Sequence, residues 1–311
     1  MAKKLPKAVS LIQEHTVPNL DYSSQRSISY SQTLIYNTCP HQWSLSYGKG
    51  LLKYRPTIHT VFGTALHETL QEWLTVMYNV SVKKANEINL HALLQTNMQK
   101  VYRAEKEKLG EHFSTAEDLH SFYLDGVEIL DYIKKKRTMY FSTQKTYLVG
   151  VEVPLLTPLT SNLFFKGFID VVFYDEDADK YLVIDIKTST SGWNEAAKKD
   201  DKKTAQLLLY KEFLAKQFNI DVENIDVQYF IVKRKIPADP EYAAMARRVQ
   251  EFKPAAGKIK RGQVLSSLNR FITDCFDDKG KFIDKEYGKR PSPSACRFCE
   301  YRNTEHCDVG F

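Results

Sequence analysis

The sequence predicts an α/β protein, in which a strand-rich core follows a long helical region. Short apolar runs rich in β-branched and aromatic residues, such as residues 181–187, predict buried strands. The polar residues 175–180 separate two such runs and predict a hairpin, which would make the two strands neighbours. Apolar residues at helical spacing over residues 61–80 predict an amphipathic helix with one buried stripe.

Four regions are expected along the chain. Helices are predicted near residues 91–109, 116–137 and 264–276, and a strand over residues 225–232 closes the core. The N-terminus has two prolines and few periodic apolar residues, which predicts little structure. The regions are 1–19, a poorly structured N-terminus; 20–146, a helical region read as an insertion; 147–235, the core; and 236–311, a helical return that ends in three cysteines.

Composition fits an intracellular protein that handles nucleic acid. The 311 residues are 43% apolar and 12% aromatic, which excludes wholesale disorder, and their net charge of +6 is a mild basic bias. No apolar segment approaches membrane-spanning length, and no signal peptide is apparent, so a cytoplasmic location without a membrane partner is expected. Basic residues cluster at 134–137, 198–203, 233–235 and 258–261. Each cluster is either a solvated surface or a contact for nucleic-acid phosphates.

Three charged residues at the ends of predicted core strands form the first candidate site. Asp170 lies inside one apolar run, and Asp185 and Lys187 lie at the end of the next. Alternation along a strand places Asp185 and Lys187 on the same face. Because charged groups are costly to desolvate, their position indicates a function. A surface hairpin with an ordinary Asp–Lys pair is the simpler alternative, since such triplets also arise by chance.

Metal-assisted hydrolysis of phosphodiester bonds suits these groups. The carboxylates of Asp170 and Asp185 are oxygen ligands of the kind that Mg²⁺ or Mn²⁺ prefers. A bound cation polarises the scissile phosphate and lowers the pKa of the attacking water. Lys187 is expected to orient or deprotonate that water, or to stabilise the developing negative charge.

Four motifs, in the same order, resemble those of the PD-(D/E)XK nucleases. Residues 167–170 followed by residues 185–187 resemble the G-x-x-D and (D/E)-x-K core of that superfamily. Residues 206–210 resemble the Q-x-x-x-Y element of the RecB-type branch, and residues 63–67 resemble its G-x-x-x-H element. The resemblance extends over nearly the whole chain. It implies a restriction-endonuclease-like mixed-sheet core with a helical N-terminal insertion.

The resemblance also implies roles for individual residues. His67 would join Asp170 and Asp185 as a metal ligand, although a lone histidine at this helix position is more often a packed or capping group. Gln206 and Tyr210 lie four residues apart and share a helix face, so both can reach one phosphate or water. Packing of an amphipathic tyrosine is the alternative for Tyr210.

Glu152 is a further candidate for the catalytic site. It interrupts a predicted strand over residues 147–155, where a carboxylate among apolar residues needs a partner. Its place resembles that of a glutamate often found in the strand before G-x-x-D in this family. It would hold the metal through water or pair with a basic side chain.

The cysteines form the second strong signal. Cys296, Cys299 and Cys307 follow a C-x2-C-x7-C pattern, and Cys39 lies far upstream. A C-x-x-C pair with a third nearby cysteine is typical of a soft-metal site. Resemblance to the iron–sulfur nucleases of the RecB-type branch implies a 4Fe–4S cluster held by all four, with a structural role. Zinc, with either Cys307 or His306 as the last ligand, is the alternative.

Together these features predict a divalent-metal-dependent DNA exonuclease with an iron–sulfur cluster. Single-stranded or free DNA ends are the expected substrate, and Trp193 and Tyr210 are aromatic residues available for stacking on bases. The sequence resembles the exonuclease of CRISPR adaptation and the nuclease modules of helicase–nuclease repair machines. It also suits a virus-encoded exonuclease of recombination or replication. A non-catalytic DNA-binding or adaptor subunit that keeps the fold and the cluster is the alternative.

Overall fold

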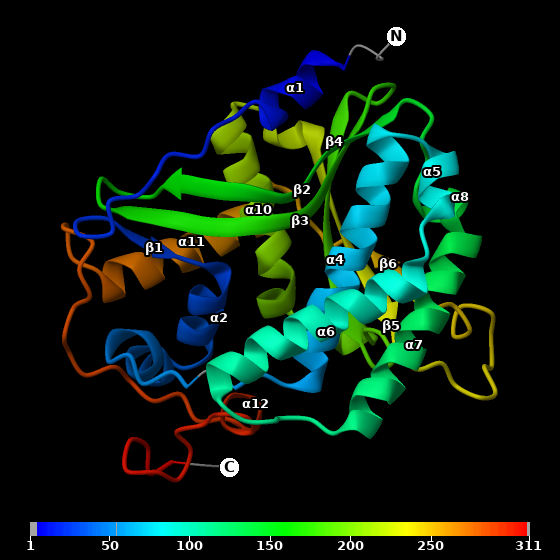
Figure 1. The fold of residues 1–311 in the computed structure, drawn as a ribbon. Helices are drawn as coiled ribbons and strands as arrows, with labels where there is room; N and C mark the ends of the chain where they lie inside the picture. The colour runs from blue at the N-terminus through cyan, green and yellow to red at the C-terminus, as the bar shows by residue number, and fades with distance from the viewer. Residues whose placement is uncertain (1–4, 54, 310–311) are drawn as a thin grey trace.

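The computed structural model describes residues 5–53 and 55–309 and contains one six-stranded mixed sheet (Figure 1). The strands are β1 (Arg26–Ile28), β2 (Thr146–Pro158), β3 (Leu163–Asp175), β4 (Lys180–Ser189), β5 (Ile225–Lys233) and β6 (Val249–Phe252). The helices are α1 (Lys7–Gln13), α2 (Tyr30–Thr38), α3 (Pro40–Trp43), α4 (Ile58–Asn79), α5 (Val82–Glu87), α6 (Leu90–Leu109), α7 (Ala116–Lys135), α8 (Arg137–Tyr140), α9 (Glu195–Lys199), α10 (Asp201–Phe218), α11 (Lys258–Cys275) and α12 (Pro293–Cys296).

The sheet combines antiparallel and parallel pairs, as the sequence predicted. β3 and β4 form the expected antiparallel hairpin around the polar turn, and the other edge of β4 pairs parallel with β5. β6 pairs antiparallel with β5, and β1 pairs parallel with β3. β2 lies antiparallel along almost the whole of β3, and the two long strands cross the molecule side by side in Figure 1.

The free edge of β3 is divided between two partners. β1 pairs with residues 163–165 and β4 pairs with residues 171–175, while β2 occupies the opposite edge of β3 throughout. Among the described strands, residues 166–169 therefore have a neighbour on the β2 side alone. We call this interruption of the sheet the β3 notch, and Asp170 lies at its end.

Helices cover both faces of the sheet and enclose two hydrophobic cores. On one face α4, α6 and α7 pack against the sheet, with Trp73 of α4 among the fully buried side chains. On the other face α10 and α11 pack with α1 and α2 around Phe165 and Tyr229. The α4 helix carries ten buried residues along its length, which agrees with the predicted apolar stripe. The site-bearing strands are thus held between two helical layers.

Two regional expectations differ from the structure. Residues 1–19 were expected to be poorly structured, yet α1 forms there and buries Val9 and Ile12 against the first core. The core was also expected to span only residues 147–235, whereas β1 and β6 extend its sheet on both sides. Edge strands of three and four residues are too short to show a hydrophobic period, so packing rather than pattern defines them.

The helices of the described segments include none that is long and apolar enough to cross a membrane.

Candidate active site

Asp170 and Asp185 meet where β3 and β4 part. The last pair of the hairpin joins Val171 to Ile184, and beyond it β4 pairs with β5 alone. The Asp170 carboxylate bridges the opening, because its Oδ2 accepts a 2.6 Å hydrogen bond from the backbone N–H of Ile186. Lys187 places its Nζ 2.7 Å from Oδ2 of Asp185, so these two side chains do share a face.

Helix α4 brings two side chains to the same place. Nδ1 of His67 lies 3.6 Å from Oδ2 of Asp170. One turn later, Gln71 is buried and its Nε2 donates to Oε1 of Glu152 at 2.6 Å and to the carbonyl of Asp170 at 3.1 Å. Gln71 was not identified from the sequence, although it follows His67 by four residues and so lies on the same helix face.

Glu152 enters the site through an unusual backbone conformation. Its φ of 48° lies in the left-handed region, which is costly for any residue other than glycine. The flanking residues Val151 and Val153 keep their pairing with β3, so this left-handed residue lies opposite Asp170, and β2 has a separate register shift between Leu148 and Gly150. Backbone strain of this kind is concentrated at functional sites, and here Gln71 holds the strained residue's side chain.

Helix α10 supplies the remaining polar groups. Lys187 donates to Oε1 of Gln206 at 2.9 Å, and Gln206 in turn donates to the Tyr210 hydroxyl at 3.0 Å. The i, i+4 spacing therefore links both side chains to Lys187 in one hydrogen-bonded chain. Gly167 allows this packing, because a Cβ at that position would come within 2.9 Å of the Tyr210 ring.

Burial changes the acidity of these groups. Desolvation raises the pKa of Asp170 to about 6, and the hydrogen bond from Ile186 opposes that rise. Desolvation likewise raises the pKa of Asp185 to about 6, against the attraction of Lys187. The pKa of His67 is lowered, chiefly by burial, so its imidazole is neutral and has a lone pair at neutral pH. Two acidic groups and one neutral imidazole with shifted pKa values indicate a functional site.

The donor atoms suit a hard divalent cation. Carboxylate oxygens with one imidazole nitrogen are ligands that Mg²⁺ and Mn²⁺ accept. Oδ2 of Asp185 is buried and makes no well-aligned hydrogen bond despite its contact with Lys187. Within residues 5–53 and 55–309, however, no three His, Cys, Asp or Glu side chains are already arranged around one metal position. Contacts within the protein already engage the carboxylates of Asp170 and Asp185. These side chains must therefore shift before a cation can bind.

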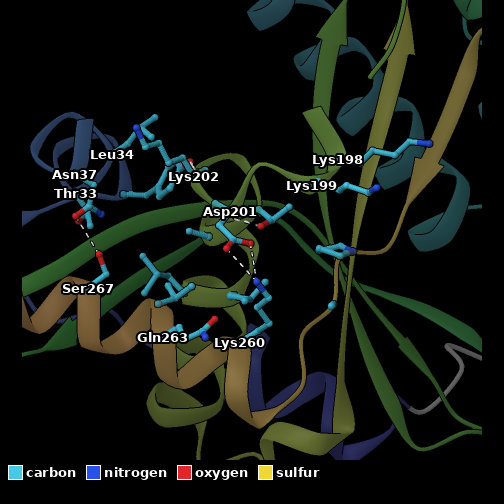
Figure 2. Close-up of a pocket in the computed structure, with 18 residues that line it drawn as sticks. Thr33, Leu34, Asn37, Lys198, Lys199, Asp201, Lys202, Lys260, Gln263 and Ser267 are labelled. Atoms are coloured by element: carbon cyan, nitrogen blue, oxygen red, sulfur yellow. Dashed lines mark hydrogen bonds and ion pairs between the residues drawn. The ribbon is translucent and has the colours of Figure 1, made fainter. Parts of the chain in front are cut away.

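Two cavities adjoin this site. The β3 notch opens into a cavity of about 360 Å³ that Asp170, Glu152, Gln206 and Tyr210 line. A larger cavity of about 590 Å³ lies between α2, α10 and α11, and Tyr30 lines both. In Figure 2 this cavity brings together Asn37 and Ser267, which share a hydrogen bond, and the ion pair of Lys260 with Asp201. Its further basic residues are Lys198, Lys199 and Lys202.

The basic cluster at residues 233–235, in contrast, is engaged by protein groups, although Lys235 is exposed. Lys233 is buried and donates to the carbonyls of Ala244 and Met245. Arg234 and Lys235 both contact the Asp125 carboxylate at 2.7 Å. These side chains hold α7 and the loop before β6 to the sheet.

The two aromatic side chains that the sequence suggested for base stacking are packed. Trp193 is half-buried against Tyr229, with ring centroids 4.8 Å apart. Tyr210 is only 6% exposed. Tyr210 therefore presents no free face of the kind that stacking on a base requires, and Trp193 is partly covered by Tyr229.

The four predicted cluster cysteines come together from opposite ends of the chain. Cys39, Cys296, Cys299 and Cys307 line one small cavity, where the segment after α12 lies beside α2 and α3 (Figure 1). Burial raises the pKa of the Cys299 thiol, and the charges of the other three cysteines add to that rise. Their sulfur atoms do not form a ready metal site in the described chain. His41 lines this cavity, and Cys275 is fully buried elsewhere.

The mixed sheet thus brings two acidic residues and a lysine together where its strands part. The sequence profile of the PD-(D/E)XK nuclease superfamily matches residues 27–304, and the chain belongs to that superfamily. A search of curated proteins returned no match. Among solved structures, one described as a "putative exonuclease" from Eubacterium rectale has a TM-score of 0.48 and 9% identity, covering 96% of this chain and 92% of that chain.

Proposed function

We propose that this protein is a divalent-metal-dependent DNA exonuclease that acts at single-stranded ends. The observation that carries the proposal is the convergence of Asp170, Asp185 and Lys187 where β3 and β4 part, in a member of a nuclease superfamily. A non-catalytic adaptor subunit would gain nothing from two carboxylates that burial makes hard to ionise.

Each side chain has a role in this proposal. Asp170, Asp185 and His67 hold Mg²⁺ or Mn²⁺, which supplies charge neutralisation at the scissile phosphate and a more acidic water when bound. Lys187 gives up its contact with Asp185 and turns its ammonium toward the phosphate, where it stabilises developing negative charge. Gln206 holds Lys187 in place, and Tyr210 holds Gln206. Glu152 accepts a proton or a hydrogen bond from the attacking water.

The larger cavity is the proposed path of the strand beyond the site. Tyr30 lines both this cavity and the β3 notch, so the two are neighbours and a strand that leaves the notch past Tyr30 would reach it. Lys199 and Lys202 are exposed on that path and contact phosphates without regard to sequence. In Figure 2 they lie on opposite sides of Asp201.

We further propose that Cys39, Cys296, Cys299 and Cys307 hold a 4Fe–4S cluster, with zinc as the alternative occupant. Four thiols that line one cavity form the soft donor set that both metals require. Held together, they would tie α2 to the C-terminal segment and so close the chain around the sheet. The free thiols suit a reducing, cytoplasmic setting.

Linear and circular single-stranded DNA of one sequence test the function. With Mg²⁺ or Mn²⁺, the wild-type protein is expected to shorten end-labelled linear DNA and to leave the circle intact. Asp185→Ala is expected to bind the linear DNA but to cut neither form. Cleavage of the circle would make the protein an endonuclease. DNA binding by both proteins with no cleavage would favour the adaptor subunit instead.

A further inference from the structure

A large aromatic side chain is exposed in the middle of the site-bearing strand. Phe168 of β3 is 47% exposed, whereas its neighbour Ile169 is fully buried. Side chains alternate along a strand, so Phe168 shares a face with Lys166, and Asp170 follows two residues later. All three line the cavity of the β3 notch.

The backbone that carries Phe168 is rigid. β2 pairs with β3 on one side through Pro154 opposite Phe168, and Gly167 packs closely under the Tyr210 ring. The ring therefore projects from a fixed strand rather than from a loop. Its exposure follows from the notch, because no described strand covers that edge of β3 between β1 and β4.

Phe168 is also the most open ring of this cavity. Of the other aromatic residues that line it, Tyr30 donates its hydroxyl to the carbonyl of Lys202, and Tyr210 is buried. A nucleotide has a base and a phosphate. The flat apolar ring suits the base, and the neighbouring acidic residues act on the phosphate. Base–aromatic stacking needs no particular base, which suits an enzyme that shortens any sequence.

We propose that Phe168 is the stacking platform for the base next to the scissile phosphate, and this inference rests on the nuclease function proposed above. Two residues along a strand span about 7 Å, so the Phe168 ring lies within one nucleotide of Asp170. Lys166, whose Nζ lies 3.5 Å from the hydroxyl of the exposed Tyr22, continues the same face toward the next phosphate. Bases inside a duplex are already stacked on both faces, whereas a base in a single strand can turn onto the ring, so the platform favours single-stranded DNA.

An oligonucleotide with an abasic site tests whether a base stacks on the Phe168 ring. Phe168→Ala is expected to lower kcat/KM on an intact single-stranded oligonucleotide about tenfold, within the range for loss of one stacked base. An oligonucleotide that lacks the base beside the cleaved bond is expected to lose as much with wild-type protein. The two losses are expected not to add, because each removes the same contact. Phe168→Tyr, which keeps a flat ring, is expected to retain most activity.

Tyr242→Ala is the matched control, since Tyr242 is 60% exposed in the loop between β5 and β6. It is expected to behave as wild type on both substrates. Equal fold losses for Phe168→Ala on intact and abasic DNA would overturn the proposal, as would full activity of that variant. Either result concerns Phe168 alone, because the wild-type protein is cutting DNA in the same assay.

A binding measurement separates this inference from the proposed function. A fluorescent 2-aminopurine base at the terminal position is expected to be quenched by wild-type protein in EDTA, and not by Phe168→Ala. Quenching that depends on Phe168 in a protein that never cuts DNA would keep the platform and remove the nuclease. Cleavage by the wild type with identical fluorescence for both proteins would remove the platform and keep the nuclease.

Discussion

The backbone N–H of Ile186 donates a 2.6 Å hydrogen bond to the carboxylate of Asp170. This single contact joins β3 to β4 just past the point where their regular pairing ends. It holds Asp170 against Ile186, the residue that follows Asp185 in β4. The segments that carry Asp170 and Asp185 therefore meet through a side chain that spans a break in the sheet.

Gln71 is predicted to position Glu152 without touching substrate. Gln71→Ala removes its hydrogen bonds to Glu152 and to the Asp170 carbonyl, and is expected to reduce kcat about tenfold to a hundredfold with little change in KM. Gln95→Ala, on the exposed face of α6, is the control and is expected to have no effect. A loss of activity that arises wholly from unfolding, seen by circular dichroism, would contradict the positioning role.

Glu152 is predicted to lower the stability of the fold through its backbone strain while its carboxylate supports hydrolysis. Glycine tolerates its φ of 48°, whereas alanine retains the strain, so Glu152→Gly is expected to be more stable than Glu152→Ala by about 1 kcal/mol. Both variants lose the carboxylate and are expected to be equally impaired in hydrolysis. Urea unfolding and initial rates measure the two properties, and a glycine variant less stable than the alanine variant would argue against strain.

Local pattern predicted much of this architecture. Strand alternation placed Asp185 beside Lys187, and their charged atoms are 2.7 Å apart. The hairpin between β3 and β4 and the long helices α6 and α7 also follow from composition and period. These features depend on residues close together in the sequence, where turn chemistry and periodicity suffice.

Long-range packing explains what the sequence did not reveal. Gln71 meets Glu152 across 81 positions, and only the placement of α4 over the sheet brings them together. Nothing in the residue type marks Glu152 for a left-handed φ. The exposure of Phe168 likewise depends on which strands leave the edge of β3 uncovered, a property of the whole sheet.

The metal-free protein is predicted to lose stability as pH rises. The pKa of Asp185 is about 6 in the folded protein against an ordinary value of 3.8, so the folded state binds this proton more tightly. That stabilisation is complete below pH 3.8 and is lost as pH rises through about 6. The free energy of unfolding of Asp185→Asn is expected to exceed that of the wild type by about 3 kcal/mol at pH 7 in EDTA. The two are expected to be equal near pH 4.

Urea unfolding of both proteins across this pH range measures the difference. Added Mg²⁺ is expected to raise the melting temperature of the wild type and not of Asp185→Asn, because a ligand stabilises only the state that binds it. A constant difference between the two proteins at every pH would show that ionisation of Asp185 costs the fold nothing.

A metal held by the four cysteines is predicted to join α2 to the C-terminal segment. Cys307→Ser is expected to lose bound metal and visible absorption and to melt several degrees lower, because the metal site contributes to folding. Cys275→Ala is the control for metal content and visible absorption, because Cys275 is buried away from the cavity. A colourless wild type that contains zinc would replace the cluster with zinc, and a metal-free wild type would remove the site.

Hydrolysis of end-labelled single-stranded DNA by the anaerobically purified protein tests the central claim most directly. Wild-type protein with Mg²⁺ or Mn²⁺ is expected to shorten the DNA, to stop in EDTA, and to resume when the cation is restored. Asp170→Asn and Asp185→Asn are each expected to reduce the rate at least a thousandfold while DNA affinity is kept. Cleavage that continues in EDTA, or that survives both substitutions, would contradict a metal-dependent site where β3 and β4 part.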